Sequence, residues 1–314
     1  MVEFGVQLWQ EEFDYSGLKR AWREIEDMGY DSVWIYDHFY PVSCTTSRYI
    51  LEAWTLLPSL ALETNGIKFG VLVTCNSYRF PSLLAKIAAT VDVISGGRLQ
   101  FGIGVGWYKE EYDSYGIPFP DAKTRIEQLA EAMELMKIVW TQEKANFQGK
   151  YYTVRDLVSF PKPLQKPHPP IWIGGKGEKL LKVVAQHANY VNFPQCSVED
   201  LLQRLEVLKR HCANVGRNFE AVGKTWYGMV IIADKEEAKR KALLWQENDA
   251  NAEVRKMSFS DFKNNNIVGT PQQCVEKIQR YVDLGMTYFI PHFPFAEDLK
   301  AIRIFMDEVV PAFK

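Results

Sequence analysis

Residues 170–179, with the sequence PIWIGGKGEK, carry the pattern that decides the fold. The apolar part, 171–173, has the length and β-branched character of a buried strand. Glycines follow at once, and residues 178–187 then show the mixed apolar and charged spacing of an amphipathic helix. A short strand, a glycine turn and a helix form one βα unit, which is the building block of a parallel sheet.

The same βα unit recurs on both sides of this segment. Together with 171–173, further apolar runs predict strands at 4–8, 32–36, 68–74, 99–103, 190–193, 225–232 and 288–291. Helices are predicted at 16–28, 51–63, 81–93, 124–140, 178–187, 198–215, 234–248, 270–285 and 297–309. Ser16 is the expected N-cap of the first helix, and Gly29 follows its expected end.

Eight alternating units predict one α/β domain over residues 1–314, with the fold of a (β/α)8 TIM barrel. Residues 141–170 form an insertion between the fourth and fifth strands, in which 146–152 predict a hairpin and five prolines predict a stiff connector. Residues 252–266 give no clear assignment. A doubly wound sheet stays open as an alternative, although the GxGxxG that would follow its first strand is missing.

The composition fits a cytoplasmic enzyme. The chain has 314 residues, 47% of them hydrophobic, which is enough to bury the core of a barrel. Its 37 basic and 39 acidic residues leave no basic excess, so neither nucleic acid nor an anionic membrane surface is an expected partner. The first residues do not predict a signal peptide, and no apolar run reaches the roughly 18 residues that a membrane helix needs. Five widely spaced cysteines without a CxxC pair favour reduced thiols over disulfides or a metal site.

Polar and glycine-rich residues follow four consecutive predicted strands. In a TIM barrel the carboxyl ends of the strands form the mouth of the active site, so these residues are expected to meet there. They are Asp37 and His38 after the second strand, Thr74, Cys75 and Asn76 at the third, Gly104, Gly106 and Trp107 after the fourth, and Gly174, Gly175, Lys176, Gly177 and Glu178 after the fifth. Aromatic residues near the same ends predict a moderately apolar substrate pocket; they are Trp9, Phe39, Trp107 and Phe293.

Segment 174–178 predicts an anion-binding loop. Its glycines let backbone N–H groups approach a phosphate, and the following helix directs its positive end toward it. Lys176 and Lys179 add positive charge. The alternative is an ordinary helix start closed by a flexible turn.

His38 is the candidate catalytic residue, because an imidazole titrates near neutral pH and can exchange a proton with a substrate. A structural histidine is the alternative. Asp37 orients a ligand or caps the next turn. His292 also faces the predicted mouth, but it lies among aromatic residues that favour packing. Glu110 and Glu111 lie near the rim, where solvated charge is the simplest interpretation.

The motifs resemble those of the luciferase-like flavin and deazaflavin oxidoreductases. The resemblance rests on Asp37-His38-Phe39 and on segments 71–86, 95–107, 170–179 and 268–271. Because the order and spacing of these motifs agree over nearly the whole chain, the chain is identified as a member of this superfamily, in the branch that depends on coenzyme F420.

The resemblance implies a homodimeric TIM-barrel oxidoreductase that moves a hydride between F420 and an organic substrate at the barrel mouth. It implies a cofactor ring backed by a bulge in the third strand, with a non-proline cis peptide at Cys75–Asn76, and a cofactor phosphate at 174–179. The FMN-dependent monooxygenases of the superfamily use the same loops, so FMN is the alternative cofactor.

The resemblance also implies that His38 lies near the substrate oxygen in members that oxidise alcohols. Those members carry a glutamate just after the fourth-strand glycines, where this chain has Trp107. The proton-relay pair is therefore incomplete unless Glu110 or Glu111 supplies the carboxylate from the next turn. A non-catalytic flavin-binding paralogue is the third hypothesis.

Overall fold

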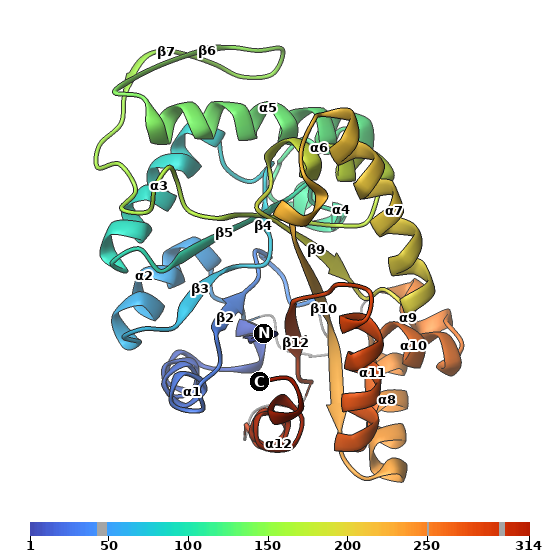
Figure 1. The fold of residues 1–314 in the computed structure, drawn as a ribbon. Helices are drawn as coiled ribbons and strands as arrows, with labels where there is room; N and C mark the ends of the chain where they lie inside the picture. The colour runs from blue at the N-terminus through green and yellow to red at the C-terminus, as the bar shows by residue number, and fades with distance from the viewer. Residues whose placement is uncertain (43–48, 250, 295–298) are drawn as a thin grey trace.

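The computed structural model describes residues 1–42, 49–249, 251–294 and 299–314. Its parallel strands form a closed barrel surrounded by helices, which confirms the predicted (β/α)8 TIM barrel (Figure 1). Around the ring the strands follow the order β1, β2, β3 with β4, β5, β8, β9, β10 and β12, and β12 pairs with β1. Their bounds are β1 Glu3–Gln7, β2 Ser32–Ile35, β3 Lys68–Val71, β4 Thr74–Cys75, β5 Leu99–Gly104, β8 Ile171–Gly174, β9 Tyr190–Pro194, β10 Gly223–Ile232 and β12 Tyr288–His292.

Helices follow the strands and cover the outside of the barrel. The larger ones are α1 Tyr15–Asp27, α2 Ala53–Glu63, α3 Pro81–Ile94, α5 Ala122–Thr141, α6 Glu178–His187, α7 Val198–Asn214, α8 Lys235–Asn248, α11 Pro271–Val282 and α12 Lys300–Glu308. The prediction of Ser16 as the N-cap of α1 is wrong. Asp14 is the N-cap, because its carboxylate accepts the hydrogen bond from the Gly17 N–H, and α1 begins one residue earlier than expected. Of the last predicted helix, residues 297–298 lie outside the described ranges.

The third barrel strand is interrupted at the mouth. The sequence predicts a single strand over 68–74, whereas the structure has two strands, β3 and β4, on either side of a cis peptide at Leu72–Val73. The cis peptide expected at Cys75–Asn76 is therefore wrong, and the bulge lies nearer the start of the segment.

Small residues on the neighbouring strands explain where the bulge lies. A Cβ atom at Gly104 of β5 would lie 2.8 Å from a Val73 methyl carbon, and one at Gly174 of β8 would lie 2.9 Å from the other. Only glycine at these two positions leaves room for the Val73 side chain. From the opposite side, Gln7 Nε2 donates a hydrogen bond of 2.7 Å to the Leu72 carbonyl.

The insertion forms an antiparallel hairpin of β6 Lys144–Gln148 and β7 Thr153–Val158, which runs alongside α5 (Figure 1). Glu131 of α5 holds its turn, because the carboxylate accepts hydrogen bonds of 2.6–2.9 Å from the backbone N–H groups of Lys150, Tyr151 and Tyr152. The hairpin is longer than the expected 146–152. The ring of barrel strands continues directly with β8.

Residues 252–266, unassigned from the sequence, form two short helices after α8. These are α9 Ala252–Lys256 and α10 Phe259–Asn265, followed by the edge strand β11 Ile267–Gly269. They belong to an apolar cluster with Trp9, Tyr36 and Trp245, so α9 lies beside the barrel mouth. None of the helices within the described ranges is both long and apolar enough to span a membrane.

Candidate active site

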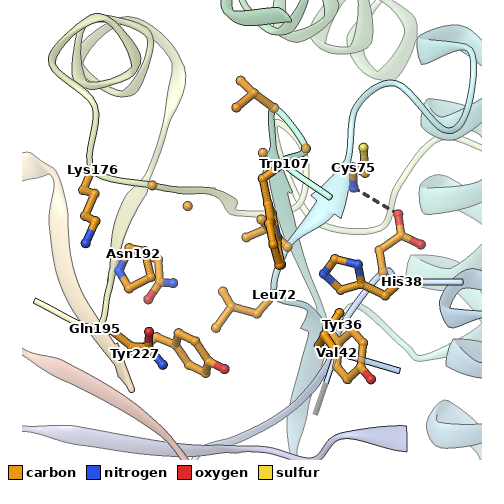
Figure 2. A pocket seen from close by; sticks show the side chains of 18 of the residues that line it. Tyr36, His38, Val42, Leu72, Cys75, Trp107, Lys176, Asn192, Gln195 and Tyr227 are labelled. Atoms are coloured by element: carbon orange, nitrogen blue, oxygen red, sulfur yellow. Dashed lines mark hydrogen bonds between the residues drawn. The ribbon is translucent and has the colours of Figure 1, made fainter. Parts of the chain in front are cut away.

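A cavity of about 600 Å³ opens at the carboxyl ends of the barrel strands, which is the size of a small-molecule site (Figure 2). The predicted site residues that line it are Asp37, His38, Thr74, Cys75, Gly104, Gly106, Trp107, Gly174, Gly175, Lys176 and Gly177. Asn76 and Glu178 do not line it. Of the predicted aromatic wall, Trp9 and Trp107 line the cavity, whereas Phe39 stacks on Tyr78 and Phe293 packs against Phe305.

His38 lies at the edge of this cavity, beside the indole of Trp107 (Figure 2). Its ring is 5.7 Å from the Trp107 ring and 5.2 Å from that of Tyr36. Nδ1 lies 2.8 Å from a carboxylate oxygen of Glu111. Within the described part of the chain, Nε2 has no hydrogen-bond partner, so it is the nitrogen available to a ligand.

Glu111 is completely buried and receives four hydrogen bonds. Oε1 accepts from the backbone N–H groups of Phe39 at 2.5 Å and Tyr40 at 3.0 Å, and Oε2 accepts from the Tyr78 hydroxyl at 2.5 Å and faces His38. Burial alone would raise the pKa of Glu111, but its hydrogen bonds, first of all that with His38, hold the pKa below the ordinary value. Glu111 is therefore an ionised carboxylate, which can only accept hydrogen bonds.

The interpretation of Glu111 as a solvated charge is therefore wrong, whereas the same interpretation of Glu110 is correct. Glu110 is exposed and accepts a hydrogen bond of 3.1 Å from the Tyr108 hydroxyl. Trp107 occupies the position where a glutamate was expected, with 55% of its surface exposed and its ring stacked on Tyr108. The carboxylate beside His38 comes from the next helical turn, in the short helix α4 Lys109–Ser114.

Asp37 lines the cavity, but its carboxylate is already engaged. Arg79 donates two hydrogen bonds to it, of 2.7 and 2.9 Å, and the Cys75 N–H donates a third of 3.0 Å (Figure 2). Arg79 also pairs with Glu52 of the α2 N-cap. This arrangement ties β2 to β4 and the loop after it, so Asp37 supports the site by fixing its backbone.

The loop after β8 combines several features of an anion site. α6 begins after Gly177, which provides no side-chain cap, so the first N–H groups of the helix are left for a ligand. Lys176 points into the cavity on the side away from His38 (Figure 2). Arg204 of α7 donates to the Lys176 carbonyl, and its buried Nε has no partner within the described residues. Arg204 is paired with Asp200 at 3.4 Å, so Lys176 is the cation of this region that faces the cavity.

Asn76 and Glu178 lie outside the cavity. The Asn76 amide donates to the Tyr152 hydroxyl at 3.3 Å and joins the third strand to the inserted hairpin. Glu178, in the first turn of α6, pairs with Arg210 of α7 at 2.8 Å. Both contacts join structural elements around the cavity and do not contribute to its lining.

Cys75 and Thr74 face the cavity with groups of low reactivity. Burial, reinforced by the charge of Asp37, raises the pKa of the Cys75 thiol to about 12, so the thiolate needed for nucleophilic attack is absent at neutral pH. Its sulfur lies 3.0 Å from the Tyr112 hydroxyl. Thr74 Oγ1 accepts a hydrogen bond of 3.1 Å from the Trp54 indole.

His292, the second histidine near the predicted mouth, is completely buried and does not line the cavity. Its ring stacks on Trp9 at 4.0 Å and packs against Trp245. Burial lowers its pKa to about 3, so the ring is neutral in the core. The packing interpretation of this residue therefore holds.

Other polar residues that line the cavity belong to no sequence motif and are not among the predicted site residues. Gln7 and Asn192 lie within buried barrel strands, Gln195 directly follows β9, and Tyr227 lies in the middle of β10. Asn192 Oδ1 accepts from Thr225 at 3.0 Å, which leaves the amide N–H groups to donate. The only signal in the sequence is a polar residue inside an apolar strand.

The fold and the site define a class of protein: a barrel enzyme with a cofactor-sized cavity, a glycine-rich loop with a lysine after β8, and at its mouth a histidine bonded to a buried carboxylate. The family model described as luciferase-like monooxygenase matches residues 1–288, and the chain belongs to this family.

Individual relatives are similar over most of the chain. The chain is 28% identical to the F420-dependent glucose-6-phosphate dehydrogenase of Microbacterium testaceum, over 100% of this chain and 98% of that protein. It is 27% identical to the FMNH2-dependent dimethylsulfone monooxygenase of Pseudomonas putida, over 77% of this chain and 73% of that one. The solved structure of an F420-dependent secondary alcohol dehydrogenase in complex with an F420-acetone adduct superposes with a TM-score of 0.89 at 19% identity, covering 100% of this chain and 99% of that chain.

Proposed function

We propose that the protein is an oxidoreductase that transfers a hydride between coenzyme F420 and an organic substrate bound in the cavity. The observation that carries the proposal is His38, which lines the cavity with Nδ1 tied to Glu111 and Nε2 left for a ligand. A base held in this way can take the proton of a hydroxyl group while the adjoining carbon loses a hydride. Similarity to an F420-dependent enzyme over the whole chain favours F420 over FMN.

The residues of the cavity fit a ligand with a flat ring and a phosphate-bearing tail. The bulge at Leu72–Val73 and the glycines around it would hold the ring, and the backbone of 174–177 with Lys176 would hold the phosphate. When bound, the deazaflavin supplies the hydride chemistry, which no protein side chain provides. The chain itself supplies orientation, exclusion of water and the proton acceptor His38.

The charge of the cavity favours an uncharged substrate. Among the described residues that line it, Lys176 is the only lysine or arginine, and it belongs to the loop proposed for the cofactor. Asp249 and Glu253 line the part formed by the end of α8 and by α9, together with the rings of Trp9 and Tyr36. A second phosphate, as in a sugar phosphate, would meet carboxylates and aromatic rings there.

We therefore expect the enzyme to oxidise uncharged alcohols in preference to glucose 6-phosphate. With F420 supplied, loss of the absorbance of its oxidised form is measured against a panel of secondary and aryl alcohols and against glucose 6-phosphate. The expected kcat/KM for the best uncharged alcohol exceeds that for the sugar phosphate by at least about 100-fold, which corresponds to about 3 kcal/mol of discrimination. Equal or better turnover of glucose 6-phosphate would contradict the assignment of the substrate and leave that of the cofactor intact.

The cofactor itself is tested by titrating the purified protein with F420 and with FMN while following tryptophan fluorescence. Micromolar or tighter binding of F420, with weaker binding of FMN, is expected. The Lys176→Ala substitution should weaken F420 binding about tenfold, because a partly solvated ion pair with a phosphate is lost. Lys182→Ala, on an exposed face of α6, is the matched control and should leave the affinity unchanged. A preference for FMN would support a monooxygenase, and binding of neither ligand would support a non-catalytic paralogue.

We further propose that the protein acts as a homodimer in the cytoplasm. Exposed apolar side chains at the start of α3, at the end of β7 and on the connector after it support a contact between copies; they include Phe80, Leu83, Val158, Phe160 and Leu164. Light scattering of the purified protein should give twice the mass of 36.2 kDa.

A further inference from the structure

We infer that Glu111 is a positioning residue that acts through His38: it fixes the Nδ1–H tautomer and thereby makes Nε2 the atom that exchanges a proton with the substrate. The reaction in this inference rests on the proposed function. The tautomer, in contrast, is a property of the protein alone and can be measured without cofactor or substrate.

The position of the Glu111 carboxylate is fixed independently of His38. Oε1 accepts the backbone N–H groups of Phe39 and Tyr40, and Oε2 accepts the Tyr78 hydroxyl. The loop after β2 therefore wraps around a buried carboxylate that α4 provides from the segment after β5. Because backbone donors hold Oε1, Oε2 is the oxygen directed at the imidazole.

A neutral imidazole carries one N–H, and the acceptor beside it decides which nitrogen has the proton. An ionised carboxylate oxygen 2.8 Å from Nδ1 can only accept, so the proton is on Nδ1 and the lone pair is on Nε2. When Nε2 takes a second proton, the new charge of the ring is offset by the adjacent carboxylate. Glu111 thus selects the reactive nitrogen and stabilises its protonated form.

In both alcohol oxidation and carbonyl reduction, every proton and electron pair of the proposed step has a donor and an acceptor. In alcohol oxidation, the hydroxyl oxygen gives its proton to Nε2 and its carbon gives a hydride, with both electrons of the C–H bond, to the oxidised deazaflavin. A C=O double bond remains, and His38 is left as an imidazolium. In carbonyl reduction, the imidazolium returns the proton to the oxygen. The titratable groups packed around His38 are Glu111, Tyr36 with its partner Glu11, Tyr78 and Tyr108.

The Glu111→Gln substitution gives a sharp test, because its geometry inverts the tautomer. The amide oxygen must stay on the two backbone N–H groups that now bind Oε1, so the amide NH2 faces Nδ1 of His38. An NH2 group can only donate, which forces Nδ1 to accept and places the ring proton on Nε2. A ring with this tautomer cannot take the substrate proton.

We expect kcat of the Glu111→Gln variant to fall by at least about 100-fold, as when a catalytic histidine is held in the wrong tautomer. F420 affinity should change by less than about threefold, since the anion loop is untouched. Glu110→Gln, an exposed neighbour on the same helix, is the matched control and should keep the wild-type rate.

The second readout is the tautomer of His38 by 15N NMR of the cofactor-free protein. The chain has five histidines, and the His38→Asn variant identifies the signals of His38. The expected result is a proton on Nδ1 in the wild type and in Glu110→Gln, and on Nε2 in Glu111→Gln. If Glu111→Gln fails to fold, Glu111→Asp keeps the charge and should retain the Nδ1–H tautomer.

Two results would overturn the inference: a wild-type His38 protonated on Nε2, or a Glu111→Gln variant with an inverted tautomer and an undiminished rate. Failure of the protein to bind F420 would count against the proposed function, and the NMR result would still decide whether Glu111 sets the tautomer.

Discussion

His38→Asn is expected to lower kcat for alcohol oxidation by roughly 100- to 10,000-fold, the range that a positioned general base contributes. The Asn amide has nearly the same reach but cannot accept a proton at neutral pH. F420 binding should change little, because Lys176, in the loop proposed to hold the cofactor's phosphate, lies across the cavity from His38 (Figure 2). The measurement is steady-state F420 reduction with the best alcohol, together with the fluorescence titration of the same variant.

Chemical rescue provides the control for this prediction. His38→Ala leaves a space between Trp107 and Tyr36, and added imidazole should restore part of the lost rate if only the base is missing. An unchanged kcat in His38→Asn with F420 still bound would show that the histidine is structural. A loss of F420 binding in the same variant would assign it to the cofactor.

The barrel and its mouth follow from the sequence because both are determined by local patterns. Strands buried on both faces appear as short continuous apolar runs, such as 171–173, and each helix between them shows its own amphipathic spacing. Once the units are ordered, chain connectivity places every strand end at the same edge of the sheet. The polar residues after four strands could therefore be expected to meet.

The bulge and the partner of His38 depend on contacts between distant segments, which no local pattern shows. The position of the bulge follows from two glycines on neighbouring strands that leave room for Val73, and Gln7 of β1 binds the carbonyl beside it. Glu111 stands in a charged run that is typical of a solvated helix, but the loop after β2 buries it. A contact across 73 residues cannot be deduced from the spacing of motifs.

Asp37→Ala is expected to lower the free energy of unfolding by about 3 kcal/mol, because it leaves a buried cation without its main partner. The side chain of Asp37 is 1% exposed and that of Arg79 is 12% exposed. After the substitution, Arg79 keeps Glu52 as its one ion-pair partner among the described residues, and the Cys75 N–H loses its acceptor. Urea unfolding followed by circular dichroism measures the change.

The exposed pair of Glu3 and Lys68, also at 2.9 Å, is the matched control, and Glu3→Ala should cost less than about 1 kcal/mol because solvent screens its charges. If the loss of stability in Asp37→Ala comes from the buried ion pair, the two residues are coupled. The variant that lacks both Asp37 and Arg79 should then lose much less free energy of unfolding than the sum of the losses in the two single variants. A small cost for Asp37→Ala, combined with a large loss of F420 affinity, would instead mean that this carboxylate serves a ligand. The unfolding and binding measurements together therefore decide whether Asp37 stabilises the structure around the site or binds a ligand in it.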